Sequence, residues 1–564
     1  MRRQRRGLKL LALILGLSLV AAACGGDDDD GGGQEAAPAD EEPQQGGEFI
    51  DFGTFVGDPP EHIDPALNTT LDAYQVVNAV YDGLTDIDAS DPDNPQIVPQ
   101  VAESVESNDD ATEWTFTIRD GLTFADGEEI LPSTFQRSWE RASNPDFAGD
   151  YSYLFNFIEG GAEKLEGTAD TISGVQVDDE NMTLTVSLAA PYSNFDAVAG
   201  FQLFMPVPEA AGTDAASAAD WENGEMFGNG PFKLESPRSD SEIVLVPNTE
   251  WDGTQYDEAL GLPEAPHLDK ITFRVSADPD TSYNSFEAGE GQNGQIPPGR
   301  VNEATSAYAN TLDVAILGSY HFDVNLRDPV LGGDENLLLR KAISQAINRD
   351  EINEAVYENS RTVANGVTPE GIPGWGADLC DDCAYDPEAA QADFEEWQSQ
   401  GHELTEPIRI QYNLGAGHEN VVAIMIDNLA SIGIEAVEEG IDTETYFTQL
   451  ADGACTICRA GWFADYPTYD NFMYDLFHTD SLGGNNYGYS NPQFDELVDE
   501  AKATTDPDEQ ASLFQEAESI LLDDVGVIPI VWYRGDYVFN EDEVGGFTQT
   551  NFGLITWENV FIKS

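Results

Sequence analysis

The chain has 564 residues, enough for two or more hydrophobic cores, and carries 106 acidic residues against 24 basic ones, a formal net charge of -82. Such a charge repels nucleic acids and anionic lipid surfaces, so both are excluded as partners. The acidic residues are spread along the whole chain, and their repulsion destabilises the compact state where the Debye length is about 10 Å. We therefore expect a protein adapted to high salt, with an acidic surface protein from an ordinary habitat as the alternative.

Residues 1–23 have the pattern of a signal peptide. Five basic residues precede Leu10 to Val20, an apolar run that is too short to span a bilayer. The run ends in Ala21-Ala22-Ala23-Cys24, which resembles a bacterial lipobox with Ala in place of the commoner Leu at its first position. We expect Cys24 to be the lipid attachment site and the first mature residue. An ordinary cleavage site followed by a chance cysteine is the alternative.

Residues 24–47 are rich in Gly, Asp, Glu, Pro and Gln and contain no apolar cluster. Such a segment cannot bury enough surface to fold, so we expect a disordered tether. After it, no hydrophobic run reaches membrane-spanning length. The sequence therefore predicts an extracytoplasmic protein that is anchored to the cell membrane through its N-terminal lipid.

Beyond the tether, strand and helix patterns are mixed along the chain. Alternating apolar residues predict half-buried strands at 114–118, 184–188, 243–246, 271–275 and 322–326. Helical spacing covers 339–347 and 421–432, and the second helix ends at Gly433 before a short strand at 434–437. Further helices are predicted after Asn491-Pro492 and after Asp506-Pro507. The mixture indicates an α/β fold without a solenoid repeat.

Besides Cys24, four cysteines form two C-x-x-C pairs, Cys380/Cys383 and Cys455/Cys458. Four thiolates could hold a structural zinc ion, but exported cysteines usually form disulfides. Three pairings are possible, and the sequence does not decide among them. We favour two local bridges because the first pair lies in a loop rich in Gly and Pro that can curl.

The segment from Arg459 to Phe472, RAGWFADYPTYDNF, places a single carboxylate among aromatic residues. A carboxylate held between Trp462, Phe463 and Tyr466 is poorly hydrated, so it favours a cationic partner. Asp465 could therefore anchor a positively charged group of a ligand. The alternative is that the rings belong to the core and that Asp465 caps the turn started by the following proline.

The sequence shows no catalytic motif that would identify an enzyme. It contains no G-x-S-x-G elbow, no Walker A loop and no G-x-G-x-x-G that opens a helix. His402-Glu403 and His418-Glu419 begin like a zinc-protease motif, but the second His is missing from both. We therefore expect no enzymatic activity, no cofactor and no metal site, and keep a secreted hydrolase as a remote alternative.

Short motifs recur in a fixed order along the chain. They are IVPQVAES (97–104), WTFTIR (114–119), GLTFADG (121–127), NGPF (229–232), LRKAI (339–343), INR (347–349) and YSNPQFD (489–495). Together they resemble the family 5 solute-binding proteins of peptide ABC importers, from about residue 48 to the C-terminus. Within that family, the run RAGWFADY is most similar to the oligopeptide-binding branch.

This resemblance implies an α/β, two-lobed periplasmic-binding-protein type II fold with an additional domain inserted in lobe I. Lobe I would comprise 48–81, 211–317 and 533–564, the inserted domain 82–210, and lobe II 318–532. Crossing strands would join the two lobes. Hinge closure would enclose the ligand between them and exclude water from its polar contacts.

The resemblance also implies a set of ligand-binding residues. In the oligopeptide-binding branch the Asp of the W-x-A-D-Y run receives the α-ammonium of a peptide, and here that residue is Asp465. The segment before it pairs with the peptide main chain, so Gly461 and Phe463 would offer backbone groups. His418 matches a position near the peptide carboxylate, with a plain surface His as the alternative. Further expected pocket residues are Arg459, Trp462, Tyr466 and, in the loop from Asn68 to Ala73, Thr69, Leu71 and Ala73.

Two positions depart from the family pattern. Leu450 stands where an oligopeptide binder can have a basic residue for a distant carboxylate, so the preferred peptide length stays open. Phe463 stands where the family has a cysteine, so the family's disulfide cannot be transferred to this chain.

The function implied by the resemblance is that of a lipid-anchored, monomeric receptor. It would bind peptides and pass them to the permease subunits of an ABC transporter. Other members of the family bind nickel chelates, oligosaccharides or haem. A metal chelate favours His or Arg in the pocket over an ammonium-seeking Asp, although Arg459 keeps this alternative open.

Overall fold

The computed structural model describes residues 43–564, except 89–94, 148, 236, 309–313, 416 and 482–486. The predicted signal peptide, Cys24 and nearly all of the predicted tether lie outside the described residues. Within the described part, no helix is long and apolar enough to cross a membrane.

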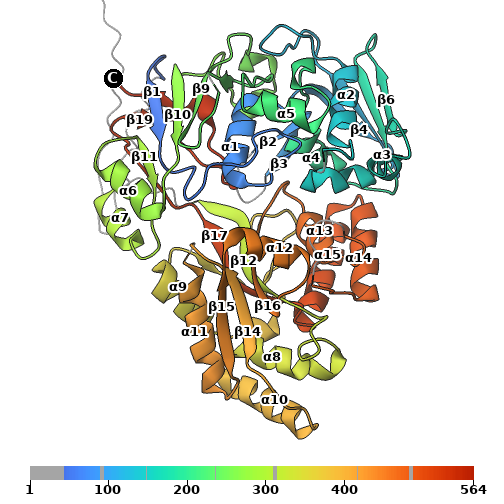
Figure 1. Cartoon of the computed structure of the whole chain (residues 1–564). Coiled ribbons are helices and arrows are strands. Elements are labelled where there is room, and N and C mark those ends of the chain that lie inside the picture. Colours follow the sequence, from blue (N-terminus) through green and yellow to red (C-terminus); the bar gives the residue numbers. More distant parts are fainter. Residues whose placement is uncertain are drawn as a thin grey trace, which may run out of the picture. The chain divides into compact units, whose positions relative to one another are not determined.

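The first of three main sheets joins a strand near the N-terminus to three strands from the middle of the chain (Figure 1). Its order is β1-β10-β9-β8, with β1 parallel to β10 and the other pairs antiparallel. Phe49, Ile271 and Trp557 share the hydrophobic cluster that packs on it. Its strands are Glu48–Asp51 (β1), Lys270–Arg274 (β10), Glu242–Pro247 (β9) and Phe232–Leu234 (β8).

Several smaller elements accompany this sheet. Helix α1 (Leu71–Val80) contacts β8 and begins at Thr70, whose side chain accepts a hydrogen bond from the backbone of Ala73. The others are α5 (Ala215–Glu222), α6 (Pro279–Glu287), α7 (Val301–Ala307), β11 (Asn293–Gln295) paired with β18 (Tyr537–Phe539), and β19 (Val544–Gly545) paired with β20 (Phe561–Ile562).

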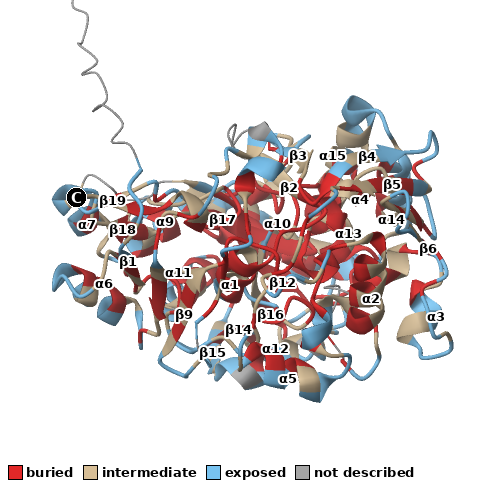
Figure 2. Ribbon diagram, turned by 90° about the horizontal axis from the view of Figure 1, so that it is seen from above, coloured by how far each residue is buried: buried red, intermediate tan, exposed pale blue. Residues whose placement is uncertain are grey.

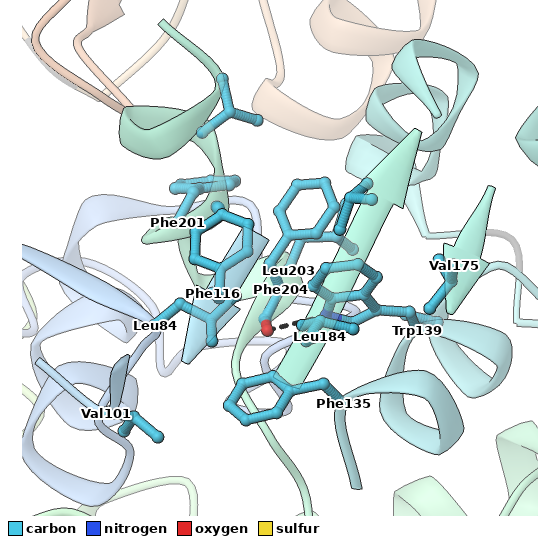
Figure 3. Packing of buried hydrophobic residues seen from close by; sticks show 14 of the residues in the cluster. Leu84, Val101, Phe116, Phe135, Trp139, Val175, Leu184, Phe201, Leu203 and Phe204 are labelled. Atoms are coloured by element: carbon cyan, nitrogen blue, oxygen red, sulfur yellow. Dashed lines mark hydrogen bonds between the residues drawn. The ribbon is translucent and has the colours of Figure 1, made fainter. Parts of the chain in front are cut away.

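The second sheet is antiparallel, with the order β4-β5-β7-β6, and lies within residues 102–187. Figure 3 shows aromatic side chains packed against it, where Trp139 Nε1 donates a 2.9 Å hydrogen bond to the carbonyl of Phe204. The strands of this sheet are β4 (Ala102–Ser107), β5 (Glu113–Ile118), β6 (Val175–Asp178) and β7 (Thr183–Ser187). The same region of the chain contains a separate pair of strands, β2 (Thr85–Asp88) and β3 (Gln96–Pro99), and the helices α2 (Pro132–Ala142), a 3-10 helix (Asp150–Phe157), α3 (Gly161–Leu165) and α4 (Phe195–Ala199).

The third sheet has six strands in the order β13-β17-β12-β16-β14-β15. β14 runs parallel to β15 and β16, whereas the other pairs are antiparallel. The strands are β12 (Ala315–Val324), β13 (Thr362–Val363), β14 (Ile408–Asn413), β15 (Ala436–Ile441), β16 (Ile457–Phe463) and β17 (Val527–Arg534).

Eight helices accompany the third sheet within the described part of 337–523. They are α8 (Leu337–Ala346), α9 (Arg349–Tyr357), α10 (Pro387–Ser399), α11 (His418–Ser431), α12 (Thr443–Ala451), α13 (Asp470–Phe477), α14 (Pro492–Ala503) and α15 (Pro507–Asp523). All residues of β12 except Ala315 are buried, as expected for a strand paired on both sides (Figure 2).

The predicted elements are confirmed, with two shifts in their ends. The strand expected at 322–326 begins at Ala315, because it pairs with β16 and β17 along most of its length, and ends at Val324. The strand expected at 434–437 begins only at Ala436. Gly433, at φ +87°, ends α11 in the left-handed conformation, and the amide of Ile434 still donates to the carbonyl of Leu429.

Both disulfides are local, as favoured from the sequence. Cys380 is bonded to Cys383 and Cys455 to Cys458. The second bridge closes the turn that leads into β16, so it lies directly before Arg459. The alternative interpretation, a zinc site built from these four thiolates, is therefore wrong.

Candidate functional site

β16 carries the segment that the sequence marked as functional. It pairs with β12 from Ile457 to Phe463, but with β14 only through Ile457 and Cys458. One edge of β16 from Arg459 onward therefore has no strand beside it among the described residues. The chain leaves the strand after Phe463 and begins α13 at Asp470.

Asp465, just beyond β16, is held by one side chain that is distant in sequence, Tyr151, and by one from the same segment, Asn471. The Tyr151 hydroxyl donates to Oδ1 at 3.0 Å, and Asn471 Nδ2 donates to Oδ2 at 3.4 Å. Burial, and then the neighbouring carboxylate of Asp475, raise the pKa of Asp465 to about 8. Within the described residues Asp465 forms no ion pair with a Lys, Arg or His.

Asp465 also lines a small cavity of about 30 Å³, together with side chains that include Tyr74, Asp86 and Phe201. A cavity of this size holds a small polar group, on the order of one or two water molecules. Because the carboxylate bonds to side chains rather than to the backbone of the turn within the described part, the interpretation of Asp465 as a turn cap is wrong.

The aromatic residues expected around Asp465 contact other side chains instead. Trp462 Nε1 donates to Asn471 Oδ1 at 3.0 Å, and the Tyr466 hydroxyl donates to Asp475 Oδ2 at 2.7 Å. Phe463 is 38% exposed and stacks on Tyr533, with 4.6 Å between ring centroids. Trp462 and Tyr466 therefore fix the loop, whereas Phe463 has surface left for a ligand.

Arg459 lies at the opposite end of β16 from Asp465. Its guanidinium carbon is 5.0 Å from the centroid of Tyr320, and Nη2 donates to the Tyr533 hydroxyl at 3.2 Å. Its Nε is buried without a hydrogen-bond partner, and no carboxylate pairs with Arg459 in the described part of the chain. In a chain with 106 acidic residues, an arginine without a carboxylate partner is available to an anionic ligand group.

A cavity of about 980 Å³ opens beside Arg459. Its wall combines guanidinium groups with tyrosine rings, so it offers both charge and flat apolar surface. Lining residues include Tyr320, Tyr357, Arg361, His418, Arg459 and Tyr533.

His418, the first residue of α11, is buried at this cavity, so the surface alternative is wrong. Its Nδ1 lies 3.1 Å from the Tyr320 hydroxyl. Burial, together with the positive charge of Arg459, lowers the pKa of His418 to about 3, so the ring is neutral near pH 7. His418 can therefore contribute a hydrogen bond to a ligand but no positive charge.

The three residues expected to bind the ligand in the loop from Asn68 to Ala73 differ in how far they are exposed. Thr69 is exposed, Leu71 is half-buried at the start of α1, and Ala73 is fully buried in the cluster under the first sheet. Leu450 packs against Cys455, Cys458 and Tyr487 rather than lining the large cavity.

The sequence did not indicate several residues that build the site. Tyr151, Tyr320, Tyr533 and Arg361 come from separate elements and meet only in the folded chain. Asn471 could have been found, because it lies in the same segment as Asp465 and its amide can bond a carboxylate.

Ser319, His321 and Asp323 have the composition of a hydrolase triad and lie close together in β12. Ser319 Oγ lies 3.0 Å from His321 Nδ1, and His321 Nε2 lies 3.6 Å from Asp323 Oδ1. All three are at most 3% exposed. Burial lowers the pKa of His321 to about 3 and raises that of Asp323 to about 8, so the imidazole is a poor general base. Among the described residues, no group of three His, Cys, Asp or Glu could hold a metal ion.

Known proteins resemble this chain over most of its length. Oligopeptide-binding protein OppA of Bacillus subtilis is 25% identical over 89% of this chain and 91% of its own. The probable deoxycholate-binding periplasmic protein YgiS of Escherichia coli is 26% identical over 87% and 89%. The structure of the murein tripeptide binding protein MppA of Escherichia coli has a TM-score of 0.76 at 22% identity, covering 92% of this chain and 99% of that one.

The likeness to these structures confirms the two-lobed α/β fold expected from the sequence motifs. The family model described as bacterial extracellular solute-binding proteins, family 5 Middle, matches residues 96–484. The members of this family are receptors rather than enzymes. The chain therefore belongs to family 5 of the bacterial extracellular solute-binding proteins.

Proposed function

We propose that this protein is a receptor for short peptides. The observation that carries the proposal is the pair of an acidic and a basic side chain near the two ends of β16, Asp465 and Arg459, neither of which has a counter-ion among the described residues. A peptide with free termini carries the complementary charges, an ammonium at one end and a carboxylate at the other. Each charge-assisted hydrogen bond would contribute about 1.5–3 kcal/mol.

The backbone of β16 supports the same ligand. The Arg459 carbonyl accepts from the Tyr446 hydroxyl, on the side away from β12, whereas the amide of Ala464 donates to Leu317 of β12. Because backbone groups alternate along a strand, those of Gly461 and Phe463 point to the same open edge as Arg459. An extended peptide could add a strand there, which recognises main chain rather than sequence.

The length of β16 limits the ligand that can reach both charges. Asp465 and Arg459 are six positions apart, which corresponds to at most about 20 Å along a strand. An extended peptide of roughly six residues spans this distance. A shorter peptide would suffice where the side chains of Asp465 and Arg459 extend toward its ends. Longer peptides would have to extend past Arg459 into the 980 Å³ cavity.

Mass spectrometry of the ligands released when the purified protein is denatured tests the proposal. We expect a mixture of peptides with varied sequences and free termini. A single non-peptide compound in stoichiometric amount, such as a sugar, a bile acid or a metal chelate, would contradict it.

A non-peptide ligand is the second candidate, supported by the likeness to YgiS and by the tyrosine-lined wall of the large cavity. Flat rings bind sugars, steroids and haem as well as peptide side chains. For such a ligand Asp465 would have no cation to receive, so replacing Asp465 with Asn would leave its affinity unchanged. A nickel chelate would bind through Arg459, so its affinity would also not depend on Asp465.

We further propose that the mature protein is a monomer, anchored to the cell membrane through lipidated Cys24, that delivers its ligand to ABC permease subunits. The two lobes would close over the ligand about β12 and β17, because the proposed lobe boundaries 317/318 and 532/533 fall in these strands. Lobe I would comprise 48–81, 211–317 and 533–564, and lobe II would comprise 318–532. Replacing Cys24 with Ser should release the protein from cells, and a cell-associated Cys24→Ser variant would exclude the lipid anchor.

A further inference from the structure

A compact set of contacts joins the inserted domain, 82–210, to helices α13, α14 and α15 of lobe II. It lies apart from β12 and β17, the strands that connect the lobes. Its members are Phe157, Tyr192, Ser193 and Asn194 on one side and Asp470, Tyr474, Lys502 and Gln510 on the other, and we call this set the latch.

The side chain of Lys502 is the centre of the latch. It is 7% exposed, and its Nζ lies 3.4 Å from the ring centroid of Tyr474, 4.2 Å from that of Phe157 and 4.5 Å from that of Tyr192. Two of these rings belong to the inserted domain and one to lobe II. A desolvated ammonium among aromatic faces is strongly attracted to them, so Lys502 ties the two parts together.

Hydrogen bonds join the same two parts of the chain. The backbone amide and the hydroxyl of Ser193 both donate to the Lys502 carbonyl, at 3.0 and 3.2 Å. The Tyr192 hydroxyl and, at 3.3 Å, Asn194 Nδ2 donate to the carboxylate of Asp470. Gln510 Nε2 donates to Ser193 Oγ at 2.8 Å. Three consecutive residues of the inserted domain are thus bonded to three helices of lobe II.

The inserted domain is held to lobe I by separate contacts. Arg141 forms a buried two-pronged pair with Asp64, at 3.0 and 2.5 Å, and the amide of Ala125 donates to Gly228. Because these contacts keep the inserted domain on lobe I, separating lobe I from lobe II would have to break the latch.

We propose that the latch holds the receptor closed and so sets how long a ligand stays bound, with Lys502 as its positioning residue. This inference rests on the proposed function, since it assumes that the ligand enters between the lobes. Lys502 contacts no residue predicted to touch the ligand, so its effect would act on the dissociation rate rather than on ligand selectivity.

Two variants of the full chain test the proposal. Lys502→Met keeps the length of the side chain and removes the charge, and Tyr192→Phe keeps the ring and removes the hydroxyl that bonds to Asp470. Lys341→Met is the matched control, because Lys341 is also a helical lysine of lobe II, paired at 2.7 Å with Asp382 outside the latch. Equal melting temperatures of Lys502→Met and Lys341→Met would show that folding is not the cause of any difference.

Amide exchange at Ser193 reports on the latch without a ligand, because this amide bonds across the contact. We expect Lys502→Met to speed exchange at Ser193, and dissociation of the probe hexa-alanine, by about tenfold, with a smaller effect of Tyr192→Phe. Lys341→Met should leave both unchanged. Unchanged exchange at Ser193 in both latch variants would overturn the proposal. If hexa-alanine and longer peptides fail to bind the wild-type protein, the proposed function fails, while the exchange result still decides whether the latch exists.

Discussion

The two ends of β16 differ in how they are built. At one end, Asp465 is fixed by Tyr151 and Asn471 and faces a cavity of about 30 Å³. At the other, Arg459 faces a cavity of about 980 Å³ and is contacted by tyrosines. A small, hydrogen-bonded cavity selects one chemical group, whereas a large one accepts many shapes. We therefore expect strict recognition at the amino end of a peptide and tolerance at its carboxyl end.

The largest expected effect is that of Asp465→Asn. Removing the carboxylate should weaken binding of a peptide with a free amino terminus by about 1.5–3 kcal/mol, which is roughly 10- to 150-fold in Kd. Isothermal titration calorimetry measures this. Asp86→Asn is the matched control, because Asp86 lines the same small cavity but bonds to Gln100. Equal losses in both variants would mean that general negative potential, rather than a bond to Asp465, attracts the ligand.

The raised pKa of Asp465 predicts how affinity changes with pH. Since its pKa is about 8, the carboxyl is protonated in the ligand-free protein below pH 8 and must lose its proton to bind an ammonium. Affinity should therefore fall by up to about tenfold for each pH unit below 8. Above pH 8 it should fall again, because the peptide amine, with a pKa near 8, loses its charge.

The Asp465→Asn variant serves as the control for this profile. It should flatten both sides of the curve, because the acidic side depends on the Asp465 proton and the alkaline side on the bond between the ammonium and the Asp465 carboxylate. A wild-type affinity that does not change between pH 6 and pH 8 would contradict the assigned role of Asp465.

The difference between the two ends was only partly predictable from the sequence. Local patterns predicted the helices, the strands and both short disulfides, because each depends on neighbouring residues. Asp465 was singled out as a candidate ligand-binding residue, since an isolated carboxylate among rings is visible in sequence, and its role stays a prediction. Its partner Tyr151 was not, because it lies 314 positions away and reaches Asp465 only through the packing of the inserted domain. The tyrosine wall around Arg459 was missed for the same reason.

At the tolerant end, we expect a smaller effect from Arg459→Met. A free carboxylate should lose about tenfold in affinity, and a peptide with an amidated carboxyl terminus should lose almost nothing. Fluorescence anisotropy with the two forms of one peptide measures the difference. Arg409→Met is the control, because Arg409 is an exposed arginine on the neighbouring strand β14. A similar loss for the amidated peptide would show that Arg459 supports the pocket rather than binding the carboxylate.

The smallest expected effect is that of salt on stability, which reports on the acidic surface and not on the binding site. Raising NaCl from about 0.1 M to about 2 M shortens the Debye length and should raise the melting temperature by about 5 °C. Scanning calorimetry measures the shift, and sucrose of equal osmolality is the control, since it stabilises by exclusion without screening charge. A flat response to NaCl would contradict adaptation to salt.

The central claim is that the ends of β16 bind the two ends of a peptide, strictly at Asp465 and loosely at Arg459. Calorimetric titration with one hexapeptide in free, N-acetylated, C-amidated and doubly blocked forms tests it most directly. We predict that N-acetylation weakens binding more than C-amidation does, by up to about tenfold. Equal affinity of the free and N-acetylated forms would contradict the claim.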